Sequence, residues 1–199
     1  RCRICYSENL KQILDFGEQY VINFGDKPSL KLPIKICLCQ KCGLVQSMYI
    51  FDGDVFFKQY YYKSVINQTM RAALKDIVTH AMKIVDPCDG DVVCDIASND
   101  GTLLRFYPPN LIKIGFEPAT NLCTKENYPD SRIINDYFSD NWGAPKAKII
   151  TAIAMLYSVN EINLFINSVK NTLHREGVFI VQLNWLGDIL ANNDVGDFT

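Results

Sequence analysis

Val92-Val93-Cys94-Asp95-Ile96-Ala97-Ser98-Asn99-Asp100-Gly101-Thr102-Leu103-Leu104 is the stretch of this sequence that decides the fold. In it a short apolar run ends in an acid, a turn of small residues follows, and a new apolar run begins. Sixteen residues after Gly101, another apolar run ends in Glu117-Pro118. Strand, tight turn, helix, strand and acid follow in this order in domains that bind nucleotide-containing cofactors, because the turn brings backbone N–H groups to the ligand and the acid accepts hydrogen bonds from ribose hydroxyls. We therefore expect an α/β domain with a cofactor site at this turn.

Further apolar segments predict more strands of the same sheet. We expect strands at 91–97, 111–117, 132–135, 147–156 and 177–184. Short apolar strands separated by helical patterns favour a parallel sheet that is covered on both faces. The polar residues from Asn192 to Thr199 bring no closing element, so we expect the sheet to be incomplete at its C-terminal end.

Two amphipathic patterns predict helices beside these strands. In the first, Ser64 has the residue type of a helix N-cap, apolar residues follow at helical spacing, and Asp86-Pro87 marks the stop. The second pattern runs from Ile162 to Leu173 and is expected to end at Gly177.

Five of the eight cysteines fall in the first 42 residues. Cys2-Arg3-Ile4-Cys5 and Cys39-Gln40-Lys41-Cys42 are two CxxC pairs with 33 residues between them. Two such knuckles suit one tetrahedral zinc ion, and four protein ligands leave no open position, so we predict a structural zinc bound by Cys2, Cys5, Cys39 and Cys42. A coincidental cluster or a redox pair are the alternatives. Cys37 competes for a ligand place, and we interpret it as a strand residue.

Composition and length indicate one globular core with a small additional module. The chain has 199 residues, of which 48% are hydrophobic and 21% charged. We expect a zinc-binding domain at 1–50, an aromatic connector and helix at 51–84, and a cofactor-binding domain at 85–199 that is truncated. The net charge of −2 argues against a nucleic-acid partner. No run reaches the roughly 18 apolar residues that span a membrane, and we expect a cytoplasmic location; the patterns do not indicate an oligomeric state.

The turn after the first strand bears on which cofactor binds. It keeps only Gly101 of a D-x-G-x-G-x-G pattern, but Ala97 is small enough for close backbone approach and Asn99 tolerates positive φ. The acids Asp95 and Asp100 would repel a pyrophosphate and attract a sulfonium with a free amino group, which favours S-adenosylmethionine over NAD. Glu117 would accept the ribose hydroxyls, and Asn135-Asp136-Tyr137-Phe138 would flank the adenine. An ordinary α/β turn with surface acids is the alternative.

Taken together, these motifs resemble the zinc-binding, S-adenosylmethionine-dependent C-methyltransferases, which include deoxysugar C-methyltransferases acting on nucleotide-linked keto sugars. The resemblance lies in CRxC near the start, CxxCGLVQ at Cys39–Gln46, Tyr60-Tyr61-Tyr62-Lys63-Ser64, DIASNDGTLL at Asp95–Leu104 and GFEPA at Gly115–Ala119. It implies a class I methyltransferase Rossmann-like sheet behind a small zinc-ribbon-like N-terminal domain.

The resemblance also assigns residues to the site. It places the Tyr62–Ser64 stretch over the cofactor and substrate side. With the reasoning above, the expected cofactor-binding residues are Asp95, Ala97, Asn99, Asp100, Gly101, Glu117, Pro118, Asn135, Asp136, Tyr137, Lys63 and Ser64. The sugar enzymes carry an Asn-Val-x-x-His-type segment after the fourth strand, where this chain has Ile153-Ala154-Met155-Leu156-Tyr157-Ser158. Their His-Glu-His motif after the fifth strand does not occur before Thr199.

Methylation of a carbon next to a carbonyl needs a base that removes a proton, and such a base is poised near neutral pH. The only histidines, His80 and His174, fall on the predicted helices, so we interpret both as surface or packing residues. Tyr62 and Tyr157 are weak candidates for the catalytic base, and the catalytic residues stay unassigned.

The sequence thus predicts an S-adenosylmethionine-dependent methyltransferase that acts on a small molecule, by C-methylation of a nucleotide-linked sugar. The acceptor and its acceptor atom are left open by the residues after the fourth strand. Two alternatives remain: a zinc-ribbon binding or scaffold module with a degenerate Rossmann domain, and an NAD-dependent oxidoreductase. The acids in the turn and the missing GxGxxG argue against the oxidoreductase.

Overall fold

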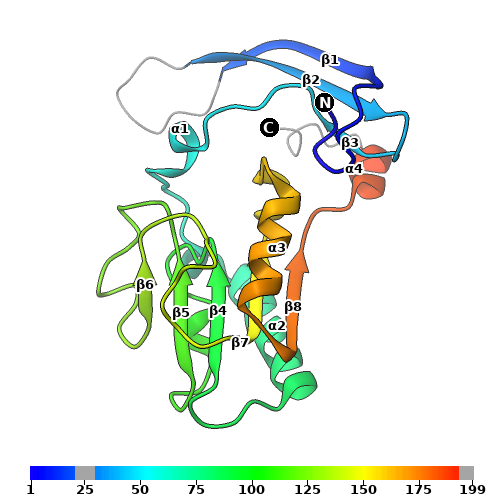
Figure 1. The fold of residues 1–199 in the computed structure, drawn as a ribbon. Coiled ribbons are helices and arrows are strands. Elements are labelled where there is room, and N and C mark those ends of the chain that lie inside the picture. Colours follow the sequence, from blue (N-terminus) through cyan, green and yellow to red (C-terminus); the bar gives the residue numbers. More distant parts are fainter. Residues whose placement is uncertain (21–29, 193–199) are drawn as a thin grey trace. The chain divides into compact units, whose positions relative to one another are not determined.

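A computed structural model describes residues 1–20 and 30–192 of the chain (Figure 1). Contacts divide it into two compact units. The first contains Arg1–Asp52, Asn160–Asn163 and the residues from Asn184 onward, and the second contains Gly53–Val159 and Leu164–Leu183. The three-part division at 50 and 84 stays a prediction.

The first unit is built on an antiparallel sheet of three strands in the order β1-β2-β3. The strands are β1 (Leu10–Tyr20), β2 (Lys31–Cys39) and β3 (Val45–Ser47), and α4 (Leu186–Asn192) belongs to the same unit. Its buried hydrophobic residues within the described part are few: Cys2, Ile36, Cys37 and Cys39. So small a core is below what usually holds a module together, and cross-linking by a metal is the usual remedy.

The second unit is built on a parallel sheet of five strands in the order β6-β5-β4-β7-β8. The strands are β4 (Val92–Ile96), β5 (Ile112–Phe116), β6 (Arg132–Ile134), β7 (Ala147–Ile153) and β8 (Leu173–Gln182). All five lie where the apolar runs predicted strands, although most are shorter. The chain moves outward from β4 to β6 and then returns to β7, so the strand order reverses beside β4. In open parallel sheets, ligands bind at such a reversal, at the carboxyl ends of the strands.

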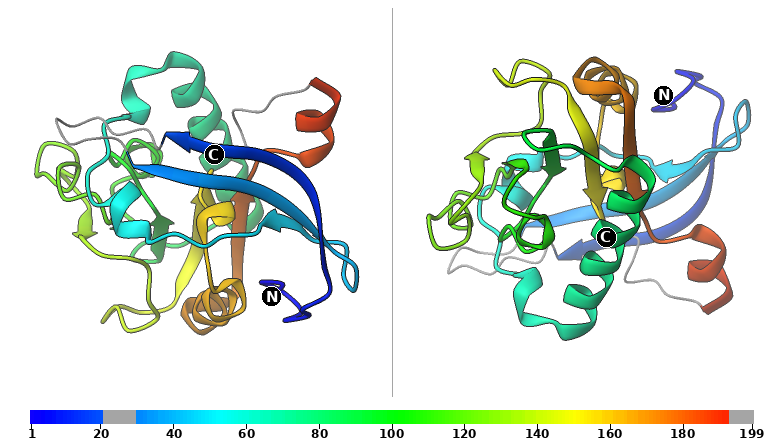
Figure 2. Two further views of the ribbon diagram at one scale, coloured as in Figure 1. Left: turned by 90° about the horizontal axis from the view of Figure 1, so that it is seen from above. Right: turned by 90° about the horizontal axis from the view of Figure 1, so that it is seen from below.

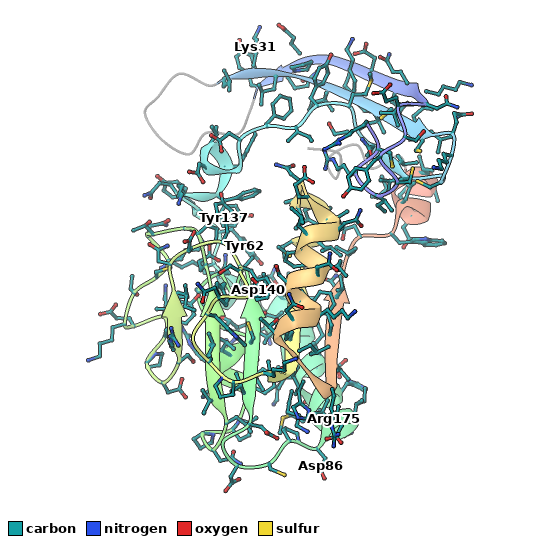
Figure 3. The ribbon with its side chains drawn as sticks, in the orientation of Figure 1. Lys31, Tyr62, Asp86, Tyr137, Asp140 and Arg175 are labelled. Carbon is teal, nitrogen blue, oxygen red and sulfur yellow. The ribbon has the colours of Figure 1, made fainter. Side chains whose placement is uncertain are left out.

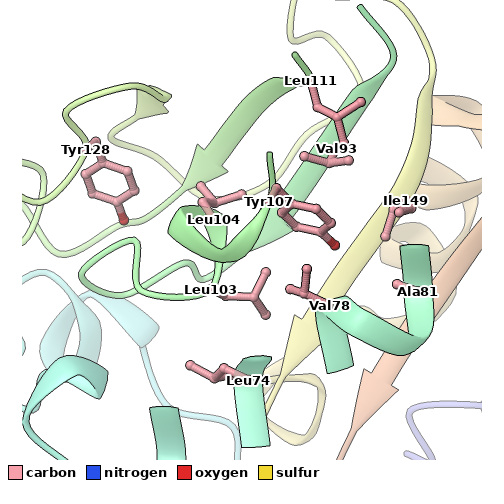
Figure 4. Packing of buried hydrophobic residues seen from close by; sticks show 10 residues of the cluster. All are labelled: Leu74, Val78, Ala81, Val93, Leu103, Leu104, Tyr107, Leu111, Tyr128 and Ile149. Atoms are coloured by element: carbon pink, nitrogen blue, oxygen red, sulfur yellow. The ribbon is translucent and has the colours of Figure 1, made fainter. Parts of the chain in front are cut away.

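Both faces of this sheet are covered, as predicted. Successive residues of a strand face opposite sides. Val93 and Ile149 therefore pack with Leu74 and Val78 of α2 (Gln68–Val85) on one side (Figure 4). On the other side, the cluster around Ile96 and Ile150 packs against α3 (Ile162–Thr172) and includes Phe116 stacked on Trp142. Figure 2 looks along the strands and shows α2 and α3 on opposite sides of them.

The predicted start of the first long helix was wrong. Ser64 opens a short 3₁₀ turn, η1 (Ser64–Ile66), whereas α2 begins at Gln68 with Asn67 as its N-cap. The side chain of Asn67 accepts a hydrogen bond from the Met70 N–H at 3.1 Å, which is the work of an N-cap. The predicted stop is confirmed, because Asp86 ends the helix in a left-handed conformation with φ 46°.

The predicted end of the second helix was also wrong. α3 ends at Thr172, and both His174 and Gly177 lie in β8. Glycine is required at 177 for a different reason, since a Cβ there would lie 2.9 Å from the carbonyl oxygens of Ala147 and Lys148. His174 is thus a residue at the amino end of a strand rather than a helix residue.

The helix expected between β4 and β5 is reduced to one 3₁₀ turn, η2 (Leu104–Phe106). Pro108-Pro109 follows almost at once, and proline lacks the N–H that a continuing helix would need. Two more short helices are α1 (Gly53–Phe57) and η3 (Leu156–Ser158). Among the helices of the described ranges, none combines the length and apolarity that crossing a membrane requires.

Candidate functional site

The turn after β4 has the backbone shape of a glycine-rich loop, although Gly101 is its only glycine. Every second residue is left-handed, with φ 56° at Ala97, 54° at Asn99 and 71° at Gly101. These are the three glycine positions of a D-x-G-x-G-x-G pattern. Left-handed conformation costs an ordinary residue about 1–2 kcal/mol and asparagine less, so the surroundings must hold Ala97 in place.

Hydrogen bonds from neighbouring segments hold this turn. The Ser98 N–H donates to the Phe116 carbonyl at 2.9 Å, which ties the turn to β5. The buried hydroxyl of Tyr128 donates to the Asn99 carbonyl at 2.6 Å and also contacts the Ser98 hydroxyl at 2.8 Å. A Cβ at Gly101 would lie 2.7 Å from the Asn127 carbonyl oxygen, so glycine is needed there for space as well. Sequence reasoning missed Tyr128, since no motif surrounds it.

Glu117 follows β5 directly, one strand away from the turn. Its carboxylate accepts the Asn99 N–H at 2.7 Å and the Ala119 N–H at 2.8 Å, and only 5% of the residue is exposed. Burial raises its pKa, and the two N–H donors partly offset that effect. A carboxylate has about four acceptor positions, so this group is held in place with capacity left for ribose hydroxyls.

Asp95 differs from the expectation that its charge faces the ligand. It is the fourth residue of β4, is 4% exposed, and accepts a hydrogen bond from the Thr151 hydroxyl of β7 at 2.5 Å. Burial raises its pKa to about 7, against a smaller lowering by Thr151 and a further raising by the charge of Glu117. Its side chain is therefore buried against the neighbouring strand β7, just before the turn.

Asp100 is also turned into the protein and has no exposed surface. One carboxylate oxygen accepts the Thr102 N–H at 3.2 Å and the Thr102 hydroxyl at 2.6 Å. The other accepts the Val65 N–H at 3.0 Å. The carboxylates of Asp95 and Asp100 are thus both buried, and each accepts hydrogen bonds from other groups of the protein.

Residues 58–65, here called the crossing segment, run across the carboxyl ends of β4 and β5. At one end, the Lys58 carbonyl accepts the Thr120 N–H at 3.2 Å. At the other end, the Asn99 side chain accepts the Ser64 N–H at 2.9 Å and donates to the Tyr62 carbonyl at 3.0 Å. The predicted site residues Lys63 and Ser64 are thereby brought next to the turn.

The residues after β6 complete the surroundings of Glu117. The Asn135 side-chain amide donates to the Glu117 carbonyl at 2.8 Å and to the Pro118 carbonyl at 3.2 Å. The Asp136 carboxylate accepts the Tyr137 N–H at 2.7 Å. A hollow of about 380 Å³ lies here, lined by Phe116, Arg132, Ile134, Asp136, Tyr137, Ser139, Asn141, Trp142 and Gly143. Figure 3 labels Tyr62 and Tyr137 at this end of the strands.

The two candidate bases lie at the same end of the sheet as the turn, where the strands have their carboxyl ends. Tyr62 is 42% exposed on the crossing segment, and Tyr157 is 57% exposed in η3, which follows β7. His80 is an exposed residue of α2 whose ring contacts Asp76 one turn earlier, which fits its interpretation as a surface residue. His174 lies at the amino end of β8, away from the carboxyl ends of the strands.

In the first unit, the four predicted metal ligands come together. The sulfur atoms of Cys2, Cys5, Cys39 and Cys42 all lie within 4.8 Å of one another. The sulfur atoms of Cys2 and Cys42 lie 3.5 Å apart, and those of Cys5 and Cys39 lie 3.6 Å apart. Thiolates bound at about 2.3 Å around one tetrahedral zinc lie about 3.8 Å apart, whereas a disulfide would need about 2.05 Å. The donor set therefore fits zinc. Cys37 stays outside this cluster as a buried residue of β2, as predicted.

The two knuckles have matching hydrogen bonds. The Tyr6 N–H donates to the Cys2 carbonyl at 3.1 Å, and the Gly43 N–H donates to the Cys39 carbonyl at 2.9 Å. Both donors follow a second cysteine and are left-handed, with φ 58° at Tyr6 and 78° at Gly43. Burial raises the pKa of Cys2, but hydrogen bonds from backbone N–H groups and neighbouring thiols outweigh it and lower the pKa to about 6.

Comparison with known proteins points the same way. A family model named for methyltransferases and described as "Putative zinc binding domain" matches residues 2–57. The C-methyltransferase NovU of Streptomyces niveus is 25% identical over 214 residues, which cover 96% of this chain and 49% of NovU. The chain is thus similar to a zinc-binding domain over residues 2–57 and to a C-methyltransferase over nearly its whole length. It spans about half the length of the curated relative that it matches.

Solved structures confirm the fold. An S-adenosylmethionine-dependent methyltransferase from Clostridium acetobutylicum aligns with a TM-score of 0.50 at 16% identity, over 57% of this chain and 50% of that one. The plantazolicin methyltransferase BpumL aligns with a TM-score of 0.52 at 15% identity, over 63% of this chain and 51% of that one. The five-stranded sheet therefore has the fold found in class I methyltransferases, as predicted.

Proposed function

We propose that this chain forms the zinc-binding and cofactor-binding part of an S-adenosylmethionine-dependent methyltransferase. The observation that carries the proposal is the turn after β4, whose left-handed residues 97, 99 and 101 give it the shape of a glycine-rich loop beside the point where the strand order reverses. Glu117 stands at the end of the neighbouring strand, where an acceptor for ribose is expected.

Different residues around the turn would contact different parts of the cofactor. Glu117 would accept the ribose hydroxyls, and the hollow beside Asp136 and Tyr137 would receive the adenine. The methionine part would then lie along the backbone of the turn, under the crossing segment. Bound S-adenosylmethionine supplies an electrophilic methyl group on a sulfonium. The chain's own residues bind and orient it.

The four cysteines of the first unit would hold a structural zinc ion. Four sulfur ligands leave no position for water or substrate, so this metal would take no part in methyl transfer. Its role would be to hold together a module whose buried core is small.

For the acceptor, we propose a carbon of a nucleotide-linked keto sugar. The support is the set of motifs shared with the deoxysugar C-methyltransferases and the relation to a C-methyltransferase over 96% of the chain. A base would take the proton next to the carbonyl, and the resulting enolate carbon would bond to the methyl group as the bond between that methyl group and sulfur breaks, leaving S-adenosylhomocysteine. Tyr62 and Tyr157 are the described side chains that we propose for this step.

Calorimetric titration tests the cofactor. S-adenosylmethionine and S-adenosylhomocysteine are expected to bind, and NAD is not. Heat with NAD alone would favour an oxidoreductase, and no heat with any of the three would favour a scaffold module.

Proton exchange tests the acceptor chemistry. With S-adenosylhomocysteine bound in D₂O, a C-methyltransferase that deprotonates its substrate is expected to exchange the hydrogen next to the carbonyl of a nucleotide-linked keto sugar. The exchange is followed by NMR, with a sugar that lacks the keto group as control. Methyl transfer to oxygen or nitrogen without any exchange would contradict the carbon acceptor.

A further inference from the structure

The crossing segment has little structure of its own. Residues 58–63 lie between α1 and η1, the last two residues of the segment belong to η1, and Tyr60, Tyr61 and Tyr62 are 37%, 53% and 42% exposed. A segment with so little buried surface is positioned mainly by its hydrogen bonds, because burial contributes little to holding it. The partners of those hydrogen bonds therefore decide where it lies.

Tyr60, Tyr62 and Ser64 of this segment are held by the two loops beside the proposed cofactor site. After β5, the side chain of Asn121 accepts the Tyr60 N–H at 3.0 Å and donates to the Tyr60 carbonyl at 2.7 Å. After β4, Asn99 binds both the N–H and the hydroxyl of Ser64, at 2.9 and 3.3 Å, and also the Tyr62 carbonyl at 3.0 Å. The crossing segment is thus attached at both sides of the place where the cofactor would bind.

Asn99 connects this segment to the ribose acceptor. Its backbone N–H donates to Glu117 at 2.7 Å, while its side chain holds the crossing segment. Asp100 adds the bond to the Val65 N–H at 3.0 Å and is itself fixed by Thr102. A glycine at 99 would allow the same φ without cost but would have no side chain to bind Ser64.

We propose that Asn99 and Asp100 are positioning residues that hold the segment Tyr62–Val65 as a wall of the cofactor site. This role rests on the proposed function, because the wall belongs to the same site. Asparagine stands at 99, where the motif has glycine, and its side chain holds this wall in place. When Asn99 is removed, the wall is expected to detach and the cofactor to bind less tightly, although the turn itself keeps its shape.

Two variants break the attachment from opposite sides. Asn99→Gly keeps the left-handed backbone and removes the side chain. Ser64→Pro removes both donors to Asn99, and the position accepts proline because Lys63 is extended, with φ −124° and ψ 126°. Asp86→Gly is the matched control, since it relieves a left-handed residue with φ 46° at the end of α2, outside the site.

Two readouts are measured on the full chain with zinc bound: the dissociation constant of S-adenosylhomocysteine, and the rate of chymotrypsin cleavage at Tyr60–Tyr62. For both Asn99→Gly and Ser64→Pro we expect about tenfold weaker binding, about 1.4 kcal/mol, and cleavage at least several-fold faster. Asp86→Gly is expected to change neither.

Cleavage at the wild-type rate in both variants would overturn the attachment through Asn99, whatever the ligand does. Faster cleavage with unchanged affinity would overturn the role as a wall of the cofactor site. If the wild-type chain binds no S-adenosylhomocysteine, the proposed function fails and the wall with it, while the cleavage rates still report whether Asn99 holds the segment.

Discussion

Replacing Asp95 by asparagine is expected to stabilise the second unit, and by more at pH 8 than at pH 5. Asp95 is 4% exposed in β4, and its pKa is raised by burial from 3.8 to about 7. The folded protein therefore keeps a proton that the unfolded chain releases between about pH 4 and 7. Stability conferred by the protonated form is lost as the pH rises through this window, and the loss is complete above pH 7.

The size of the effect follows from the shift. About three pKa units at about 1.4 kcal/mol each amount to roughly 4 kcal/mol of destabilisation above pH 7. At pH 5 the destabilisation is only about a third of this value, because pH 5 is about a third of the way from the unfolded pKa to the folded pKa. The substituted asparagine side chain would be isosteric and neutral and could still accept from the Thr151 hydroxyl. The stability gained by Asp95→Asn should thus grow by on the order of 2–3 kcal/mol between pH 5 and pH 8.

Urea unfolding at both pH values measures this gain, followed by the fluorescence of Trp142, which is buried in the second unit. As a control, Thr151→Val removes the donor that favours the ionised carboxylate and should destabilise the protein more at pH 8 than at pH 5. An equal gain for Asp95→Asn at both pH values would refute the reasoning, because the buried carboxyl would then titrate like an exposed one.

Three further changes have defined outcomes. Glu117→Ala should weaken S-adenosylhomocysteine binding in calorimetry by about 1.5–3 kcal/mol, the range for hydrogen bonds to a charged group, and unchanged affinity would remove Glu117 from the ribose site. Metal analysis should find one zinc per chain, and Cys5→Ser should lose both this zinc and the circular dichroism of the three-stranded sheet. Cys88→Ser alters an exposed cysteine outside the cluster and should retain the zinc. Full zinc content in Cys5→Ser would contradict the ligand set. Gly177→Ala should lower the urea midpoint by the equivalent of about 1–3 kcal/mol, because its Cβ would lie 2.9 Å from two carbonyl oxygens, and an unchanged midpoint would mean that β7 and β8 can separate there at no cost.

The sheet could be predicted because its signals are local. Each strand is an apolar run such as Val92–Ile96, and its order along the chain is read directly from the sequence. The cysteine cluster was predictable for a similar reason, since each CxxC pair carries its own turn. Helix boundaries were less secure, because Ser64 and Asn67 are both good N-cap residues and only the contact of Ser64 with Asn99 decides between them.

The interior of the candidate site could not be predicted, because it depends on contacts between distant segments. Whether Asp95 and Asp100 face a ligand or the protein is decided by Thr151 and Val65, which lie 56 and 35 residues away along the chain. Tyr128 supports the turn from 29 residues away and carries no pattern that marks it. The predicted cofactor role of the two acids stays a prediction, although their burial changes how such a role could be exerted.

The left-handed residues of the turn have a consequence for how such sites are found and redesigned. A loop of this kind is specified by its backbone angles, and residues other than glycine can adopt those angles at some positions. At position 97 alanine has a left-handed φ of 56°, so glycine there would relieve the cost of that angle. At position 99 the same change would remove a contact that holds another segment. Ala97 and Asn99 both stand where the motif has glycine, but only the side chain of Asn99 holds a second segment in place.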